Sequence, residues 1–279
     1  MDHETYRAES RRGWGSVADA WRRFAPAQRT AWMPVSVWML DAARLGPGAR
    51  VLELATGTGE LGLMAHELIQ PGGELVLSDF APEMLTAAQA HAAELGADDV
   101  RFKQIDIESI DVAAASRDAV LCRWGLMFLA DPEAGIREIR RVLRPGGRFA
   151  TAAWTTPEDN PWSSAIAAIL AERGHAEAPD PDAPGQFTFA REGMLLELLE
   201  GAGFVDELEV EALDVELVET FDACWDRTQE MSRAGELIRA LPAGEQASVR
   251  AALRERLAPY TDGDVLRTPG RTWVAAATA

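Results

Sequence analysis

Short apolar runs alternate with segments of helical periodicity through the first half of the chain. Five of these runs predict buried strands, at residues 51–54, 74–78, 100–105, 118–122 and 148–154. Between them, apolar residues recur every three to four positions, which predicts helices over 59–69, 82–95 and 132–143. Strands and helices that alternate at this spacing indicate right-handed βαβ units and a doubly wound, mostly parallel sheet of the α/β class.

The segments on either side of this region follow other patterns. Residues 7–45 are expected to be helical, and Gly46-Pro47-Gly48 ends them. After Trp154 the chain is expected to form further helices over 161–172, 191–201, 222–240 and 244–257. Among these helices lie a proline- and aspartate-rich stretch at 178–185, a strand-like run at 204–217 and a last strand at 271–276.

Composition and charge narrow the classes of function. The 279 residues include 27 Lys and Arg against 45 Asp and Glu, a formal net charge of -18. No basic run interrupts this excess of acids, so neither nucleic acid nor an anionic membrane is an expected partner. Two cysteines are too few for a disulfide framework, and no apolar run approaches the ~18 residues of a membrane span. We expect a soluble, cytoplasmic protein.

The single lysine excludes two further classes of protein. A P-loop needs Gly-Lys followed by Ser or Thr, whereas Lys103 lies between Phe102 and Gln104. Neither Tyr6 nor Tyr260 has a lysine four positions on, so the Tyr-x-x-x-Lys pair of short-chain dehydrogenases is absent. The sequence also has no His, Cys and Asp cluster with metal-ligand spacing, and no metal is expected.

A glycine-rich segment follows the first predicted strand. Gly57-x-Gly59-x-x-Gly62 fits a dinucleotide-binding fingerprint, and Asp79 lies 22 residues after Gly57. This spacing fits either a nicotinamide cofactor or another adenosyl cofactor. Glu53 favours the second, because a carboxylate just before the glycine loop would repel a pyrophosphate and attract a cation.

From Glu53 onward the sequence resembles the first motif of class I S-adenosylmethionine-dependent methyltransferases, which reads acid-x-Gly-x-Gly-x-Gly, with Ala55 in place of the first glycine. Four later segments resemble those of the family in the same order, at 78–85, 104–107, 121–128 and 143–148. The last two are most similar to the ubiquinone/menaquinone-type branch of small-molecule methyltransferases. The resemblance implies a seven-stranded, Rossmann-like sheet whose last strand, 271–276, inserts antiparallel. It also implies S-adenosylmethionine as the cofactor.

These patterns and the resemblance together predict one continuous domain with three parts. Residues 1–45 form an N-terminal helical cap, and residues 46–155 form the cofactor-binding core. Residues 156–279 supply helical lid and substrate-binding insertions together with the last strands of the sheet. The helices before and after the sixth strand are expected to cover the mouth of the sheet.

The resemblance also implies roles for individual residues. The cofactor-binding set consists of Glu53, Ala55, Gly57, Gly59, Asp79, Phe80, Met84, Asp106, Ile107, Arg123 and Trp124. Within it, Glu53 would bind the methionine end of the cofactor and Asp79 the ribose, while Arg123 and Trp124 would lie between cofactor and acceptor. The expected wall of the acceptor site consists of Trp21, Phe128 and Trp154. His175, in the insertions, is a candidate general base, and no other catalytic residue is indicated.

The expected function is transfer of the methyl group of S-adenosylmethionine to a small quinone-, phenol- or natural-product-like molecule, on carbon, oxygen or nitrogen. Such an in-line displacement is chiefly a positioning task, and positioning can supply ~7–11 kcal/mol. Three alternatives remain open: a relative that binds the cofactor but acts as a cyclase or decarboxylase, a nicotinamide-dependent oxidoreductase, and a structural or interaction protein. Monomer and homodimer are both compatible with the sequence.

Overall fold

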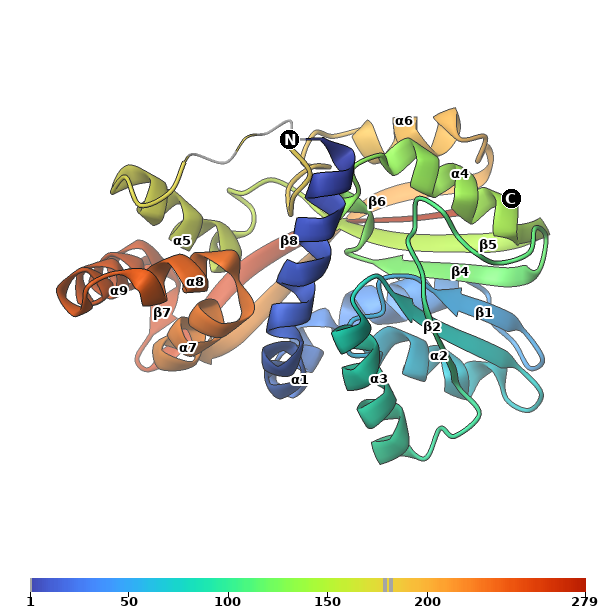
Figure 1. Cartoon of the computed structure of the whole chain (residues 1–279), viewed down its shortest axis with the longest axis horizontal. Helices are drawn as coiled ribbons and strands as arrows, with labels where there is room; N and C mark the ends of the chain where they lie inside the picture. Colours follow the sequence, from blue (N-terminus) through green and yellow to red (C-terminus); the bar gives the residue numbers. More distant parts are fainter. Residues whose placement is uncertain (1, 178–179, 181–182) are drawn as a thin grey trace.

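The computed structural model describes residues 2–177, 180 and 183–279, and an eight-stranded sheet lies at its centre. Seven strands lie side by side in the order β3-β2-β1-β4-β5-β8-β6 (Figure 1). Their bounds are β1 Arg50–Glu53, β2 Glu74–Asp79, β3 Arg101–Gln104, β4 Arg117–Arg123, β5 Leu143–Trp154, β6 Asp206–Thr220 and β8 Val265–Thr278. The short β7 (Thr261–Asp262) pairs with β8 off this path.

The direction of the strands agrees with the sequence-based prediction. The strands from β3 through β5 are parallel, and β8 runs antiparallel between β5 and β6. The expected α/β class, the mostly parallel sheet and the antiparallel insertion of the last strand are therefore confirmed.

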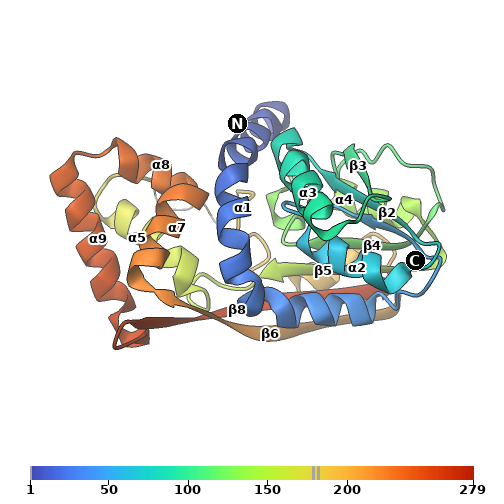
Figure 2. The ribbon, with the colours of Figure 1, turned by 90° about the horizontal axis from the view of Figure 1, so that it is seen from below.

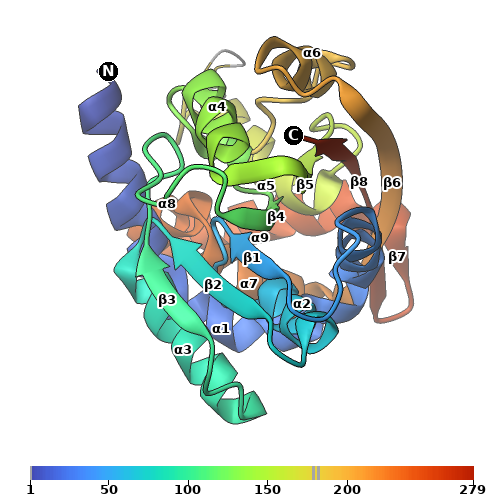
Figure 3. The ribbon, with the colours of Figure 1, turned by 90° about the vertical axis from the view of Figure 1, so that its right-hand side faces the viewer.

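Helices cover both faces of the sheet, which explains why its central strands are apolar along their length. α1 (His3–Ala42), α2 (Glu60–Ile69) and α3 (Pro82–Leu95) lie on one face, and α4 (Pro132–Val142) and α6 (Met194–Gly201) lie on the other (Figure 3). A strand that is buried on both sides has no solvent face for polar residues to occupy. β2 accordingly buries its last five residues, 75–79.

α1 is one helix of 40 residues that changes direction along its length (Figure 2). Pro26 and Pro34 lie inside it, and an interior proline removes a backbone hydrogen bond and bends the helix. In its later part, Val35 and Met39 are fully buried in the main core. In its earlier part, Ala18 packs against the start of α3. The helix thus spans from the main core to a second packing site on α3.

Four helices form a separate hydrophobic cluster at the far end of β6 and β8. They are α5 (Pro161–Glu172), α7 (Phe221–Met231), α8 (Arg233–Ala240) and α9 (Ala243–Leu257), called the helical lobe below (Figure 1). Their apolar side chains pack together, and Ile169, Ile238 and Leu257 are almost fully buried there. β8 begins at Val265 rather than at the expected residue 271, because it continues beyond the parallel strands to pair with β6 up to the lobe.

Other boundaries also differ from those that the sequence predicts, for example those of α6 and β6. Residues 222–240 form two helices and not one, because Ser232 has an extended backbone and its hydroxyl accepts from the Gly235 N–H. β5 begins at Leu143, before the expected residue 148. The stretch at 178–185 lies partly outside the described residues, and the division into cap, core and insertions stays a prediction. Within the described part of the chain, no helix combines the length and apolar character that a bilayer span requires.

Candidate functional site

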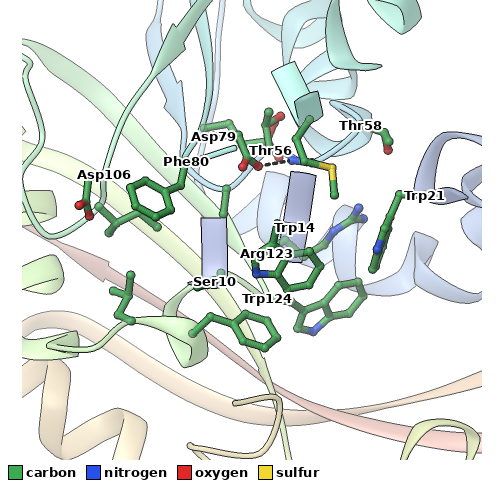
Figure 4. A pocket seen from close by; sticks show the side chains of 18 of the residues that line it. Ser10, Trp14, Trp21, Thr56, Thr58, Asp79, Phe80, Asp106, Arg123 and Trp124 are labelled. Carbon is green, nitrogen blue, oxygen red and sulfur yellow. Dashed lines mark hydrogen bonds between the residues drawn. The ribbon is translucent and has the colours of Figure 1, made fainter. Parts of the chain in front are cut away.

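A cavity lies at the carboxyl ends of β1, β2 and β4, beneath the first part of α1 (Figure 4). It holds roughly 1160 Å³ of space between atoms, some of it open to solvent. This position, where strand order reverses around β1 and β4, is where open α/β sheets bind their ligands. Twelve of the residues singled out in the sequence line it: Trp21, Glu53, Ala55, Gly57, Asp79, Phe80, Met84, Asp106, Ile107, Arg123, Trp124 and Phe128.

The loop after β1 has the tight backbone that its small residues predict. Gly57 and Gly59 have φ values of 55° and 84°, a left-handed region that favours glycine. Ala55 has φ of 51° and is therefore strained, since a Cβ atom disfavours this conformation. Gly59 does not line the cavity. A Cβ atom at this position would lie 3.3 Å from side-chain atoms of Ala88 and of Leu77, on the side of the loop that packs on the protein core. Gly59 serves the packing of the loop on the sheet.

Glu53 ends β1 with only 2% of its surface exposed. Its Oε2 accepts a hydrogen bond from the Thr56 hydroxyl and another, of 3.1 Å, from the Gly62 N–H. Burial raises the pKa of Glu53 to about 7, against the opposing effects of these bonds and of Arg123. A cation bound beside this carboxylate would favour its ionised form.

Gly62 is needed to make room for that carboxylate. A Cβ atom at this position would lie 2.4 Å from Glu53 Oε2 and 2.2 Å from Leu77 Cδ2. We expect Gly62→Ala to lower the free energy of unfolding by about 1–3 kcal/mol, measured by urea denaturation, because it overpacks the core. Gly13→Ala is the matched control, since nothing lies within 4 Å of that site in α1, and it should be slightly stabilising. Equal effects of the two changes would contradict this account.

Because the pKa of Glu53 is raised, the folded protein is expected to become less stable as the pH rises. Between pH 4.5 and 7 the unfolded chain loses this proton while the folded chain keeps it, so the folded state loses stability as the pH rises. Glu53→Gln removes the ionisation. From pH 5 to pH 8 its stability relative to the parent protein should therefore improve by about 2–3 kcal/mol, as measured by urea unfolding at each pH. A difference that does not vary with pH would contradict the assignment.

Asp79 ends β2 and is 8% exposed. The Gly57 N–H donates to its Oδ2 at 2.9 Å, and the Ala81 N–H donates to its Oδ1 at 3.0 Å. Burial raises the pKa of this carboxyl, and the backbone bonds oppose the rise. Each oxygen of a carboxylate can accept a second hydrogen bond, so Asp79 keeps the capacity to bind donors of a ligand in the cavity.

The earlier part of α1 closes one end of the cavity through contacts that the sequence did not predict. Arg7 forms an ion pair with Asp106, and the Tyr6 hydroxyl donates to the Phe128 carbonyl at 3.0 Å. Four residues from the first turns of this helix line the cavity without having been singled out in the sequence: Tyr6, Arg7, Ser10 and Trp14. They are far in sequence from their contacts, so no local pattern indicates them.

Arg123, at the end of β4, is held between two helices. One of its terminal nitrogens, Nη1, donates to Ser36 Oγ at 2.6 Å, and the other, Nη2, lies 3.5 Å from Glu60 Oε2. Burial lowers the pKa of this guanidinium. Trp124 follows with φ of 58°, and the Arg123 guanidinium carbon lies 5.0 Å from its ring centroid. The sequence-based set missed Glu60, although it directly follows the glycine loop.

Four tryptophans pack together at the wall of the cavity, and two of them, Trp32 and Trp124, line it. Trp124 and Trp154 stack with their ring centroids 4.4 Å apart, and Trp32 and Trp162 pack edge-on or tilted against them. Trp154 does not line the cavity, because Trp124 and the neighbouring rings cover it. Trp154 is therefore not part of the cavity wall in which the sequence placed it. It lies behind Trp124 and packs against that ring.

His175 is not brought to the cavity. It follows α5 in the helical lobe, where its Nε2 lies 3.5 Å from Glu245 Oε2 on α9. In the described ranges, no group of three or more His, Cys, Asp or Glu side chains has the arrangement of a metal site.

Comparisons with known proteins agree with this geometry. Residues 45–178 match a family model described as a methyltransferase domain. Over 108 residues the chain is 42% identical to the demethylmenaquinone methyltransferase of Thermus thermophilus. The aligned region covers 39% of this chain and 48% of that protein. The chain spans about half the length of the curated relatives that it matches.

Two solved structures share the architecture. The phosphoethanolamine N-methyltransferase 2 of Haemonchus contortus, in complex with S-adenosyl-L-methionine, has a TM-score of 0.55 at 16% identity and covers 90% of this chain and 56% of that one. The [4+2]-cyclase SpnF has a TM-score of 0.57 at 16% identity and covers 95% of this chain and 96% of that one. At these identities the likeness concerns the fold alone.

The sheet order, the antiparallel β8 and the glycine loop at the end of β1 define a Rossmann-like fold of the class I methyltransferase type. Together with the family match, they identify residues 45–178 as a methyltransferase domain, and the recognition made from the sequence is confirmed.

Proposed function

We propose that this protein transfers the methyl group of S-adenosylmethionine to a small-molecule acceptor. The observation that carries the proposal is the convergence of two buried carboxylates, Glu53 and Asp79, on the glycine loop of a methyltransferase domain. Carboxylates this deeply buried need a positive or hydrogen-bond-donating partner. A cofactor with a sulfonium, an ammonium and two ribose hydroxyls has the complementary groups.

Different residues of the cavity are assigned to different parts of the cofactor. Asp79 would accept from the ribose hydroxyls, and Ala55 and Gly57 would let the ligand approach the backbone. Phe80 and Met84, at the start of α3, supply apolar surface for the adenine. The Asp106 carboxylate and the neighbouring Ile107 complete the adenine site, with Arg7 of α1 beside them.

When bound, the cofactor supplies a methyl group on a positively charged sulfur, which is already activated for displacement. What the chain adds is alignment of the acceptor and exclusion of water, and this alone can account for ~7–11 kcal/mol. The cavity wall contributes Trp124 and Phe128 for an aromatic acceptor. None of the cavity-lining side chains in the described ranges is a histidine, which favours an acceptor that loses its proton readily, such as a phenol or hydroquinone.

An acceptor of the quinone, phenol or natural-product type is therefore the substrate class that we propose. The relative from Thermus thermophilus is named a demethylmenaquinone methyltransferase, and this supports a quinone-like ring. The cavity is compatible with methylation on carbon, on oxygen or on nitrogen. A cyclase step in place of methyl transfer is the second candidate, because the [4+2]-cyclase shares the fold over nearly the whole of both chains.

The test is an incubation of the purified protein with S-adenosylmethionine and a panel of reduced naphthoquinones, catechols and simple phenols. Mass spectrometry should detect S-adenosylhomocysteine and a product heavier by one methylene unit. Tight cofactor binding without S-adenosylhomocysteine from any acceptor would favour the cyclase-like alternative. Absence of binding to S-adenosylmethionine and S-adenosylhomocysteine in calorimetry would overturn the proposed function.

A further inference from the structure

Two buried polar atoms in the wall of the cavity have no hydrogen-bond partner among the described residues. They are Trp21 Nε1, a donor on α1, and Glu60 Oε1, an acceptor at the start of α2. Native proteins pair nearly all such atoms, since an unpaired buried donor or acceptor is costly. Two unpaired atoms of opposite kind in one cavity indicate a ligand that both donates and accepts hydrogen bonds there.

Glu60 can bind a cation with one carboxylate oxygen while the other oxygen stays paired with Arg123. Its side chain is 12% exposed, and its Oε2 is engaged with Arg123 Nη2 at 3.5 Å. The second oxygen, Oε1, is the unpaired one. Glu53 also uses only Oε2 in its hydrogen bonds, to Thr56 and Gly62, but neither of its oxygens is both buried and without a partner. Among the described carboxylates that line the cavity, Glu60 is therefore the one with a buried oxygen that has no partner.

Arg123 and Trp21 supply the complementary donors. The Arg123 guanidinium carries five N–H groups, and Ser36 and Glu60 engage its two terminal nitrogens through one contact each. Trp21 adds one indole N–H. In Figure 4 Asp106 and Phe80 lie on one side of the cavity and Trp21 on the other, with Arg123 and Trp124 between them. These donors are thus separated from the residues assigned to the adenine.

A carboxylate acceptor beside a guanidinium and an indole N–H matches the two charges of an α-amino acid. An ammonium needs an acidic acceptor, and a carboxylate needs charged or N–H donors. We propose that Glu60, Arg123 and Trp21 form the subsite for the amino-acid end of the cofactor. Glu60 Oε1 accepts from the ammonium, while Arg123 and Trp21 Nε1 donate to the carboxylate. The proposal rests on the proposed function and moves Trp21 from the acceptor wall to the cofactor.

The test compares two ligands that differ only at this end. S-adenosylhomocysteine carries the amino acid, whereas 5′-methylthioadenosine has the same adenosine and thioether without it. In titration calorimetry the parent protein should bind S-adenosylhomocysteine about tenfold or more tightly than methylthioadenosine. Glu60→Gln and Trp21→Phe should each weaken the S-adenosylhomocysteine complex, by about tenfold and about threefold, and leave the methylthioadenosine complex unchanged.

Two control variants separate this subsite from general effects. Glu67→Gln removes an exposed carboxylate from the same helix, α2, and should leave both affinities unchanged. Asp79→Asn should weaken both ligands alike, since both carry the ribose. Circular dichroism checks that each variant folds, and Trp21→Phe still tests the subsite if Glu60→Gln does not fold.

The possible outcomes separate the two proposals. Equal losses for both ligands in Glu60→Gln and Trp21→Phe would overturn the amino-acid subsite, and so would unchanged affinities. A parent protein that binds both ligands equally well would also overturn the subsite alone. A parent protein that binds neither ligand would overturn the proposed function, and the subsite with it.

Discussion

Replacing Asp79 by alanine is expected to weaken binding of S-adenosylhomocysteine by about tenfold or more in titration calorimetry. Each ribose hydroxyl that donates to a carboxylate contributes about 1.5–3 kcal/mol, so losing even one of them gives an effect of this size. The same change removes the acceptor for the Gly57 N–H at 2.9 Å, which holds the glycine loop toward β2. Both effects act in the same direction.

Asp79→Asn is the matched control for this prediction. The amide keeps one acceptor oxygen and nearly the same size, so its loss of affinity should be smaller than that of alanine. Thermal unfolding of both variants shows whether the fold is kept. An alanine variant that binds as tightly as the parent protein would refute the assignment of Asp79 to the ribose.

Removing one partner of the buried ion pair between Glu219 and Arg227 should cause the largest loss of stability. Their side chains are 12% and 7% exposed, and two contacts of 2.7 and 3.2 Å join them between β6 and α7. Glu219→Ala leaves the guanidinium buried without its carboxylate, which costs about 3–5 kcal/mol. Urea unfolding followed by tryptophan fluorescence measures the loss, since Trp162 and Trp225 lie in the helical lobe.

An exposed ion pair provides the comparison. Arg23 and Glu230 join α1 to α7 with side chains 60% and 39% exposed, and Glu230→Ala should cost less than about 1 kcal/mol. Replacing both buried partners, as Glu219→Leu with Arg227→Met, should recover much of the loss, because no charge is then left unpaired. A single Glu219→Ala variant as stable as the parent would show that water reaches this pair.

The sequence was sufficient for the parts of the site that depend on neighbouring residues. Glu53 and Asp79 end strands and Gly57 lies in the loop after the first of them, and parallel strands bring their carboxyl ends to one edge of the sheet. The apolar runs therefore predicted both the sheet and the place of these residues. The ends of several strands shifted, as with β8, whose added length is set by pairing with β6 and not by its own pattern.

The parts that sequence reasoning missed depend on contacts between distant segments. The Tyr6 hydroxyl meets a carbonyl 122 residues away, and Arg7 forms an ion pair with Asp106, which lies on a distant segment of the chain. Helical periodicity indicates which face of α1 is apolar, but a bend at its prolines decides which strand ends that face covers. His175 was placed near the acceptor because it lies in an insertion, yet α5 directs it toward α9.

The path of the chain into and out of the helical lobe has an evolutionary consequence. The segment 221–264 carries α7, α8, α9 and the short β7 and connects β6 to β8, and the residues on either side of it, Thr220 and Val265, form one cross-strand pair. A segment of another length or sequence can replace it at this point without a slip in the register of β6 against β8. α7, α8 and α9 thus form an exchangeable part of the lobe that packs on α5, and related proteins can differ in these three helices while the strands and the glycine loop stay the same.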